Sequence, residues 1–147
     1  EISQQQLQQG LQNVVKNTNL KGRWQVLQVA PKLICDTAHN REGLTIVLEQ
    51  LEQENYKHLH IVLGVVSDKK LGDILPLFPK EAHYYFCKPD VPRGLAAVEL
   101  QKEAQAYQLR GSVFSSVAAA KQAALDAAKK EDLIFVGGST FVVAEVV

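Results

Sequence analysis

The sequence predicts one α/β domain: a Rossmann-like, mostly parallel sheet of about six strands, with an antiparallel edge strand and helices on both faces. Short apolar segments alternate with amphipathic segments of helical length, which is typical of a parallel sheet covered by helices. Residues 59–66 are apolar and rich in β-branched side chains, which suits a strand buried on both faces. No repeat or low-complexity linker interrupts the series.

The elements follow from hydrophobic periodicity. Residues 3–15 have apolar side chains at helical spacing and predict a lead-in helix, within a connection (1–20) that precedes the domain proper (21–147). Residues 24–29 alternate as a strand, and 33–36 return as a second strand antiparallel to the first. The remaining predicted elements are helix 42–54, strand 59–66, helix 69–77, strand 82–87, helix 94–107, strand 111–114, helix 117–130, strand 133–136 and a helix from Thr140.

Composition excludes several classes of protein. Sixteen basic residues balance sixteen acidic ones, so no bulk attraction to nucleic acid or to an anionic membrane is expected. No signal-peptide pattern or spanning segment is recognisable, and we expect a cytoplasmic protein. Cys35 and Cys87 lack metal-ligand spacing and are interpreted as buried thiols.

Polar residues gather where the predicted strands end. Asp36, Thr37, His39 and Asn40 follow the second strand directly before a helix. Asp36 or Asn40 alone suits a helix N-cap, but the four together have more polar capacity than a cap needs. Because ligands of such folds bind at the carboxyl ends of the strands, this loop is a candidate site.

Two further loops have weaker signals. Ser67, Lys69 and their neighbours suit either an anion site or a solvated turn. Residues 137–140 (Gly-Gly-Ser-Thr) lead into the last helix, whose free N–H groups attract an anion. No P-loop motif or early G-x-G-x-x-G occurs, which argues against NTP hydrolysis by this chain alone and against dinucleotide binding. Taken by itself, Arg23 is an ordinary surface arginine.

Four segments together resemble the folylpolyglutamate synthase/dihydrofolate synthase family of the Mur ligase superfamily. They are G-R-W (22–24), D-T-A-H-N (36–40), G-V-V-S-D-K (64–69) and G-S-T-F-V-V-A-E-V (138–146). The resemblance implies a C-terminal glutamate-ligase domain whose partner is its own N-terminal ATPase domain. In that family ATP phosphorylates a carboxylate of pteroate or folate, and the amine of glutamate then displaces phosphate. The implied cofactors are ATP and Mg²⁺, with the Mg²⁺ ligands mainly in the N-terminal domain.

The resemblance also implies roles for individual residues. Arg23, Asp36 and Asn40 are implied to bind ATP, His39 and Lys69 to act in catalysis, and Ser67 and Ser139 to bind glutamate. No metal ligand is implied. Arg41 and Thr37 depart from the proline and glycine that are usual in the family's loop.

Three functions are compatible with these features. The first is a folate–glutamate ligase, of which this chain alone is expected to be inactive. The second is a muramyl–amino-acid ligase, whose last domain has the same architecture and a similar A-H-N loop. The third is a non-catalytic domain that binds a small anion. The sequence does not distinguish dihydropteroate from folate as the acceptor, and it does not indicate the oligomeric state.

Overall fold

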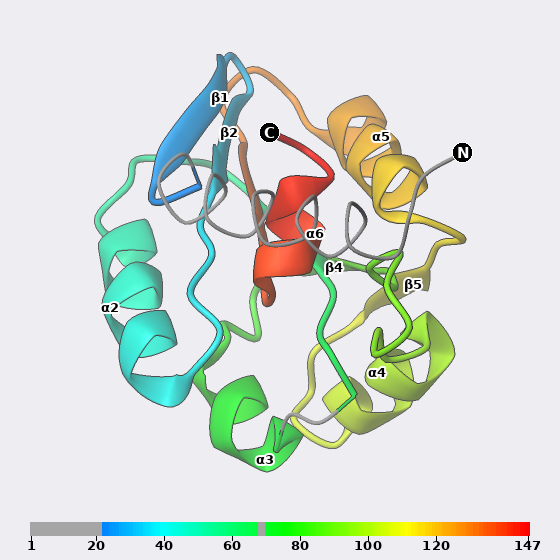
Figure 1. The fold of residues 1–147 in the computed structure, drawn as a ribbon. Helices are drawn as coiled ribbons and strands as arrows, with labels where there is room; N and C mark the ends of the chain where they lie inside the picture. The colour runs from blue at the N-terminus through cyan, green and yellow to red at the C-terminus, as the bar shows by residue number, and fades with distance from the viewer. Residues whose placement is uncertain (1–21, 68–69) are drawn as a thin grey trace.

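A computed structural model describes residues 22–67 and 70–147, in which six strands form one sheet in the order β1-β2-β6-β3-β4-β5 (Figure 1). β1 is antiparallel to β2, and all the other neighbouring strands are parallel, as predicted. The predicted lead-in helix lies outside the described residues. The strands are β1 (Gln25–Val29), β2 (Lys32–Cys35), β3 (Leu59–Leu63), β4 (His83–Phe86), β5 (Gly111–Val113) and β6 (Leu133–Gly137).

Helices lie on both faces of this sheet and divide the core in two. They are α2 (Arg41–Glu52), α3 (Leu71–Ile74) with the following 3-10 turn η1 (Leu75–Leu77), α4 (Ala97–Gln105), α5 (Val117–Ala127) and α6 (Thr140–Ala144). α2, α3, η1 and α4 pack on one face, and α5 and α6 pack on the other. Alternate residues of one strand supply the two cores: Phe135 of β6 faces α2, whereas Ile134 and Val136 face α5 and α6.

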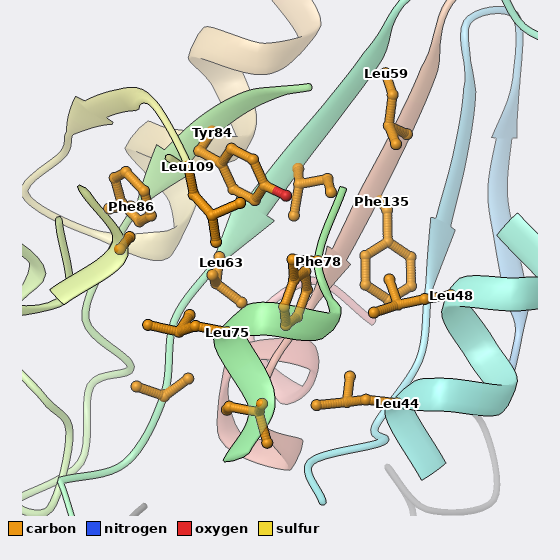
Figure 2. Packing of buried hydrophobic residues seen from close by; sticks show 14 of the residues in the cluster. Leu44, Leu48, Leu59, Leu63, Leu75, Phe78, Tyr84, Phe86, Leu109 and Phe135 are labelled. Atoms are coloured by element: carbon orange, nitrogen blue, oxygen red, sulfur yellow. The ribbon is translucent and has the colours of Figure 1, made fainter. Parts of the chain in front are cut away.

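The larger core is closed by large aliphatic and aromatic side chains. Figure 2 shows Leu48 pointing from α2 toward Phe135, with Leu75 below Leu63 and Phe78 below Tyr84. All six are almost fully buried. Because this packing fixes α2 against β2 and β6, it also fixes the loop between β2 and α2.

Three predicted boundaries were wrong by three residues. β3 ends at Leu63 because residues 64–66 leave the ladder, and Val66 instead forms an isolated bridge with Gly94. That bridge holds the following segment extended, so α4 begins only at Ala97. α5 ends at Ala127, short of residue 130, where Asp132 accepts a hydrogen bond from the Lys129 N–H.

The helices of the described part of the chain are all too short or too polar to cross a membrane.

Candidate functional site

The carboxyl ends of β2, β3, β4, β5 and β6 meet at one edge of the sheet, since these strands are parallel. β1 runs the opposite way and pairs Gln25 with Cys35, which brings the chain before β1 to the same edge. A pocket of about 380 Å³ opens here between the start of β1, the end of β2 and α2. Its lining residues are Arg23, Asp36, Thr37, Ala38, His39, Asn40, Gly43, Ile46 and Val47.

Arg23 supplies the positive charge of this pocket. Its side chain is exposed, and it forms no ion pair with any residue in 22–67 or 70–147. A planar guanidinium with five donors matches the geometry of phosphate or carboxylate oxygens. The Arg23 guanidinium can therefore donate two hydrogen bonds to an anion in the pocket.

Asp36 is the only acidic residue that lines this pocket, but its carboxylate is engaged by the protein backbone. Its side chain is buried, and both of its oxygens accept hydrogen bonds from backbone N–H groups of neighbouring chain segments. These contacts shape the loop from which His39 and Asn40 project.

Asn40 begins α2 as its N-cap, with its side-chain oxygen 2.8 Å from the Gly43 nitrogen. Asn40 thus has the capping role considered from the sequence, and its side-chain NH₂ group remains for a ligand. His39 is exposed, and its Nδ1 lies 3.2 Å from the Thr37 carbonyl oxygen. Because a carbonyl can only accept, this contact requires the proton on Nδ1, and Nε2 has no hydrogen-bond partner among the described residues.

The loop after β3 contributes Ser67, which is exposed at the same edge of the sheet but does not line the pocket. Its backbone N–H donates to the Arg93 carbonyl at 2.6 Å, which ties this loop to the segment after β4. Lys69, predicted as catalytic, lies outside the described residues.

The loop after β6 is closely packed. Ser139 is 3% exposed, and its hydroxyl accepts from the Phe141 N–H as the N-cap of α6. The glycines before it are buried against the protein, where Gly138 adopts φ 100° directly beside the Gly64 carbonyl. The contact of Ser139 with glutamate thus stays a prediction.

Both cysteines are buried and free, as interpreted from the sequence. Burial, and after it the charge of neighbouring Asp36, raise the pKa of the Cys35 thiol to about 11. Burial and then Glu145 raise the pKa of Cys87 to about 12. Neither thiol is a nucleophile at neutral pH.

The other histidines lie at the amino-terminal edge of the sheet, away from Arg23. His60 is buried, and its two ring nitrogens contact the Tyr85 hydroxyl at 2.8 Å and Asp132 Oδ2 at 3.1 Å. Since both nitrogens are engaged, this geometry supports the structural role expected for His60. His58 and His83 line two pockets at this edge, of about 220 and 570 Å³.

The described residues do not fit a resident metal ion. Nowhere in 22–67 or 70–147 do three histidine, cysteine or acidic side chains converge closely enough to hold one. In the pocket, the only carboxylate among the lining residues is that of Asp36, which already accepts two backbone hydrogen bonds. We therefore assign no metal-dependent step to these residues.

Sequence reasoning missed the apolar wall of the pocket. Ile46 and Val47 of α2 line it, and Ile46 is 65% exposed. The signal was present in the sequence, because Ile46 lies off the stripe of Leu44, Val47, Leu48 and Leu51 that α2 buries. An exposed isoleucine beside a pocket gives a ligand an apolar surface.

A doubly covered α/β sheet, with an arginine that is unpaired among the described residues in a pocket at the strand ends, is an arrangement in which α/β domains can accommodate small anionic ligands. Residues 22–140 match the family model of the Mur ligase glutamate ligase domain, and the chain belongs to this family.

Curated relatives agree with that family. The chain is 31% identical over 150 residues to the dihydrofolate synthase/folylpolyglutamate synthase of Escherichia coli, covering 99% of the chain and 33% of the relative. It is 32% identical over 136 residues to a probable bifunctional folylpolyglutamate synthase/dihydropteroate synthase of Haloferax volcanii, covering 89% of the chain and 16% of the relative. The chain thus spans a third or less of the length of these relatives.

Solved structures give the same result. The Escherichia coli FolC protein in complex with DHPP and ADP superposes with a TM-score of 0.78 at 30% identity, covering 86% of this chain and 30% of that one. The Yersinia pestis folylpolyglutamate synthase/dihydrofolate synthase with AMPPNP and Mn has a TM-score of 0.76 at 29% identity, covering 99% and 34%. A further bifunctional synthase of this kind, with Mn, AMPPNP and L-glutamate bound, has a TM-score of 0.75 at 29% identity, covering 85% and 30%.

Proposed function

We propose that this chain is the C-terminal domain of an ATP-dependent ligase that adds glutamate to dihydropteroate or folate. The observation that carries the proposal is the convergence of Arg23, Asp36, His39 and Asn40 on one pocket, although they come from two separate segments of the sequence. The similarity to folate ligases, including structures with ADP, AMPPNP and L-glutamate, supports the same function.

In this proposal the pocket faces the ATPase domain of the whole protein across a cleft. The γ-phosphoryl group passes from ATP to a carboxylate oxygen of the acceptor, releasing ADP. The amine of glutamate then attacks the acyl carbon, a proton leaves the nitrogen, and phosphate departs as the amide forms. ATP and Mg²⁺ are the proposed cofactors, and the Mg²⁺ ligands belong mainly to the ATPase domain.

Arg23 is the proposed contact to the nucleotide phosphates, because its guanidinium is unpaired among the described residues and exposed in the pocket. Asn40 and the Asp36 loop complete the nucleotide side of the site. The Nε2 atom of His39 is the proposed donor to or acceptor from the reacting groups. Lys69, Ser67 and Ser139 remain predictions for the acyl-phosphate and glutamate side.

The test uses the full-length protein that carries this chain. ATP-dependent incorporation of labelled glutamate is measured with dihydropteroate, with tetrahydrofolate, and with a UDP-linked muramyl acceptor. We expect product with a pterin acceptor and none with the muramyl acceptor. Product with the muramyl acceptor alone would identify the muramyl ligase, and no product with any acceptor would favour the non-catalytic anion-binding domain.

Point variants connect the activity to the pocket. Arg23→Ala is expected to lower kcat/KM for ATP by ~10²-fold, as for loss of one preorganised charge donor. Arg23→Lys should recover only part of the loss, because an ammonium cannot make the bidentate contact. Arg110→Ala is the matched control, since Arg110 is also exposed but lies at the opposite edge of the sheet. An Arg110 loss as large as the Arg23 loss would refute the assignment.

A further inference from the structure

The Asp36 side chain joins two chain segments that are separate in sequence. Its Oδ2 accepts a hydrogen bond from the Trp24 N–H at 2.8 Å, and its Oδ1 accepts one from the Ala38 N–H at 2.8 Å. A third bond runs between the same segments, from the Thr37 N–H to the Gly22 carbonyl at 3.0 Å. The residues on both sides of Arg23 are thus held against the loop that follows β2.

The backbone at Trp24 would not adopt this conformation by itself. Its φ is 45°, in the left-handed region that residues with a β-carbon disfavour, and bulky residues rarely occupy it. Such a conformation persists where the surrounding contacts impose it, and it often occurs beside functional groups. Here the imposing contact is the Asp36 carboxylate, and the neighbouring residue is the unpaired Arg23.

Asp36 also has little surface with which to meet a ligand directly. Its side chain belongs to a residue that is 8% exposed, and each oxygen already has a donor. By contrast, Arg23 is exposed and lines the pocket. The geometry therefore separates the residue that sets the position from the residue that contacts the anion.

We propose that Asp36 is a positioning residue, whose carboxylate holds the Gly22–Trp24 turn so that Arg23 is directed into the pocket. The effect of Asp36 on nucleotide use is transmitted through Arg23. This inference rests on the proposed function, because it assigns Arg23 to the nucleotide.

Asp36→Asn is the sharpest change, because it preserves shape but removes one acceptor. An amide has a single acceptor oxygen, so its NH₂ group must face either the Trp24 or the Ala38 N–H. We expect the turn before β1 to loosen and KM for ATP to rise, with a smaller change in kcat. A merely structural role would instead lower the amount of folded enzyme and leave KM unchanged.

A double-mutant cycle in the full-length protein tests the coupling. If Arg23→Ala and Asp36→Asn each lower kcat/KM for ATP by ~10²-fold, two independent contacts would multiply to ~10⁴-fold. The proposal predicts that the double variant loses only about as much as Arg23→Ala alone. Losses that multiply in an active, folded series would overturn it.

A measurement on the unaltered 147-residue chain keeps the test independent of variant folding. By NMR, scalar couplings across the hydrogen bonds should connect the Trp24 and Ala38 amide nitrogens to the Asp36 side-chain carboxyl carbon. A Trp24 amide without this coupling would overturn the inference, whatever the kinetics show. Absence of ATP-dependent ligation by the wild-type protein would instead count against the proposed function, and the coupling would still judge the hydrogen bond.

Discussion

Replacing Gly138 with alanine should lower the free energy of unfolding of the chain more than replacing an exposed glycine with alanine does. Gly138 follows β6 with φ 100°, where an L-residue is strained. A β-carbon there would lie 2.5 Å from the Gly64 carbonyl oxygen and 2.7 Å from Leu63 Cδ1. The oxygen belongs to a backbone that β3 and β6 hold in place, so the contact cannot be relieved by a rotamer change.

The magnitude has two parts. A non-glycine residue forced into such a backbone region costs about 1–3 kcal/mol, and overpacking a closed site costs about 1–3 kcal/mol more. We therefore expect Gly138→Ala to lower the free energy of unfolding by about 2–6 kcal/mol. With a urea m-value of about 2 kcal/mol/M, the midpoint should fall by about 1–3 M.

The assay is urea unfolding of the 147-residue chain, followed by far-ultraviolet circular dichroism. Gly72→Ala is the matched control, because Gly72 is exposed within α3 and its β-carbon would meet only the Tyr107 hydroxyl at 3.2 Å. Alanine favours a helix by about 0.5–1 kcal/mol over glycine, so this variant should be no less stable than wild type. A Gly138→Ala midpoint within 0.3 M of wild type, on the order of the uncertainty of such measurements, would refute the packing argument.

Three further predictions concern a carboxylate, a helix cap and the thiols. Burial disfavours the charged form of Asp132, but a backbone N–H and two histidines outweigh burial and hold its pKa below the usual value. The charged Asp132 carboxylate therefore stabilises the folded chain above about pH 4, and this contribution is lost as pH falls through the lowered pKa. Below about pH 4, the free energy of unfolding should consequently fall less steeply in Asp132→Asn than in the wild type. Asn40→Ala and Ser116→Ala each remove the N-cap of a helix, and each should lower the free energy of unfolding of the chain by about 1 kcal/mol. Only Asn40→Ala should also raise KM for ATP in the full-length protein. Equal effects of the two variants on KM would contradict the assignment of Asn40 to the site. Cys35 and Cys87 should stay unreactive to an aromatic disulfide reagent at pH 8 until urea unfolds the chain, because burial raises the pKa of both thiols; rapid native-state labelling would contradict their burial.

The layered fold followed from local sequence patterns. The apolar run beginning at Leu59 and the amphipathic stripe from Leu44 to Leu51 each identify one element without reference to the rest of the chain. The antiparallel edge pair was also predictable, because the turn at Pro31 leaves few residues for any other connection. These features depend on neighbours in sequence, and so the sequence alone determines them.

Boundaries and contacts between distant segments were not predictable in this way. Nothing near Val66 indicates that it pairs with Gly94 and leaves the β3 ladder. The sequence placed Asp36 at a strand end, but not its hydrogen bond to the Trp24 N–H. Residues 137–140 suggested an anion site at the start of the last helix, whereas Gly138 packs against Gly64 of the same domain. Each of these depends on how elements meet across the sheet.

An NMR titration of the 147-residue chain with ADP tests whether the pocket beside Arg23 holds the nucleotide phosphates. We expect the backbone amides of residues 22–24 and 36–43 to shift with added ADP, and Arg23→Ala to abolish these shifts. Shifts confined to the opposite edge of the sheet, around His58, His83 and Arg110, would contradict it.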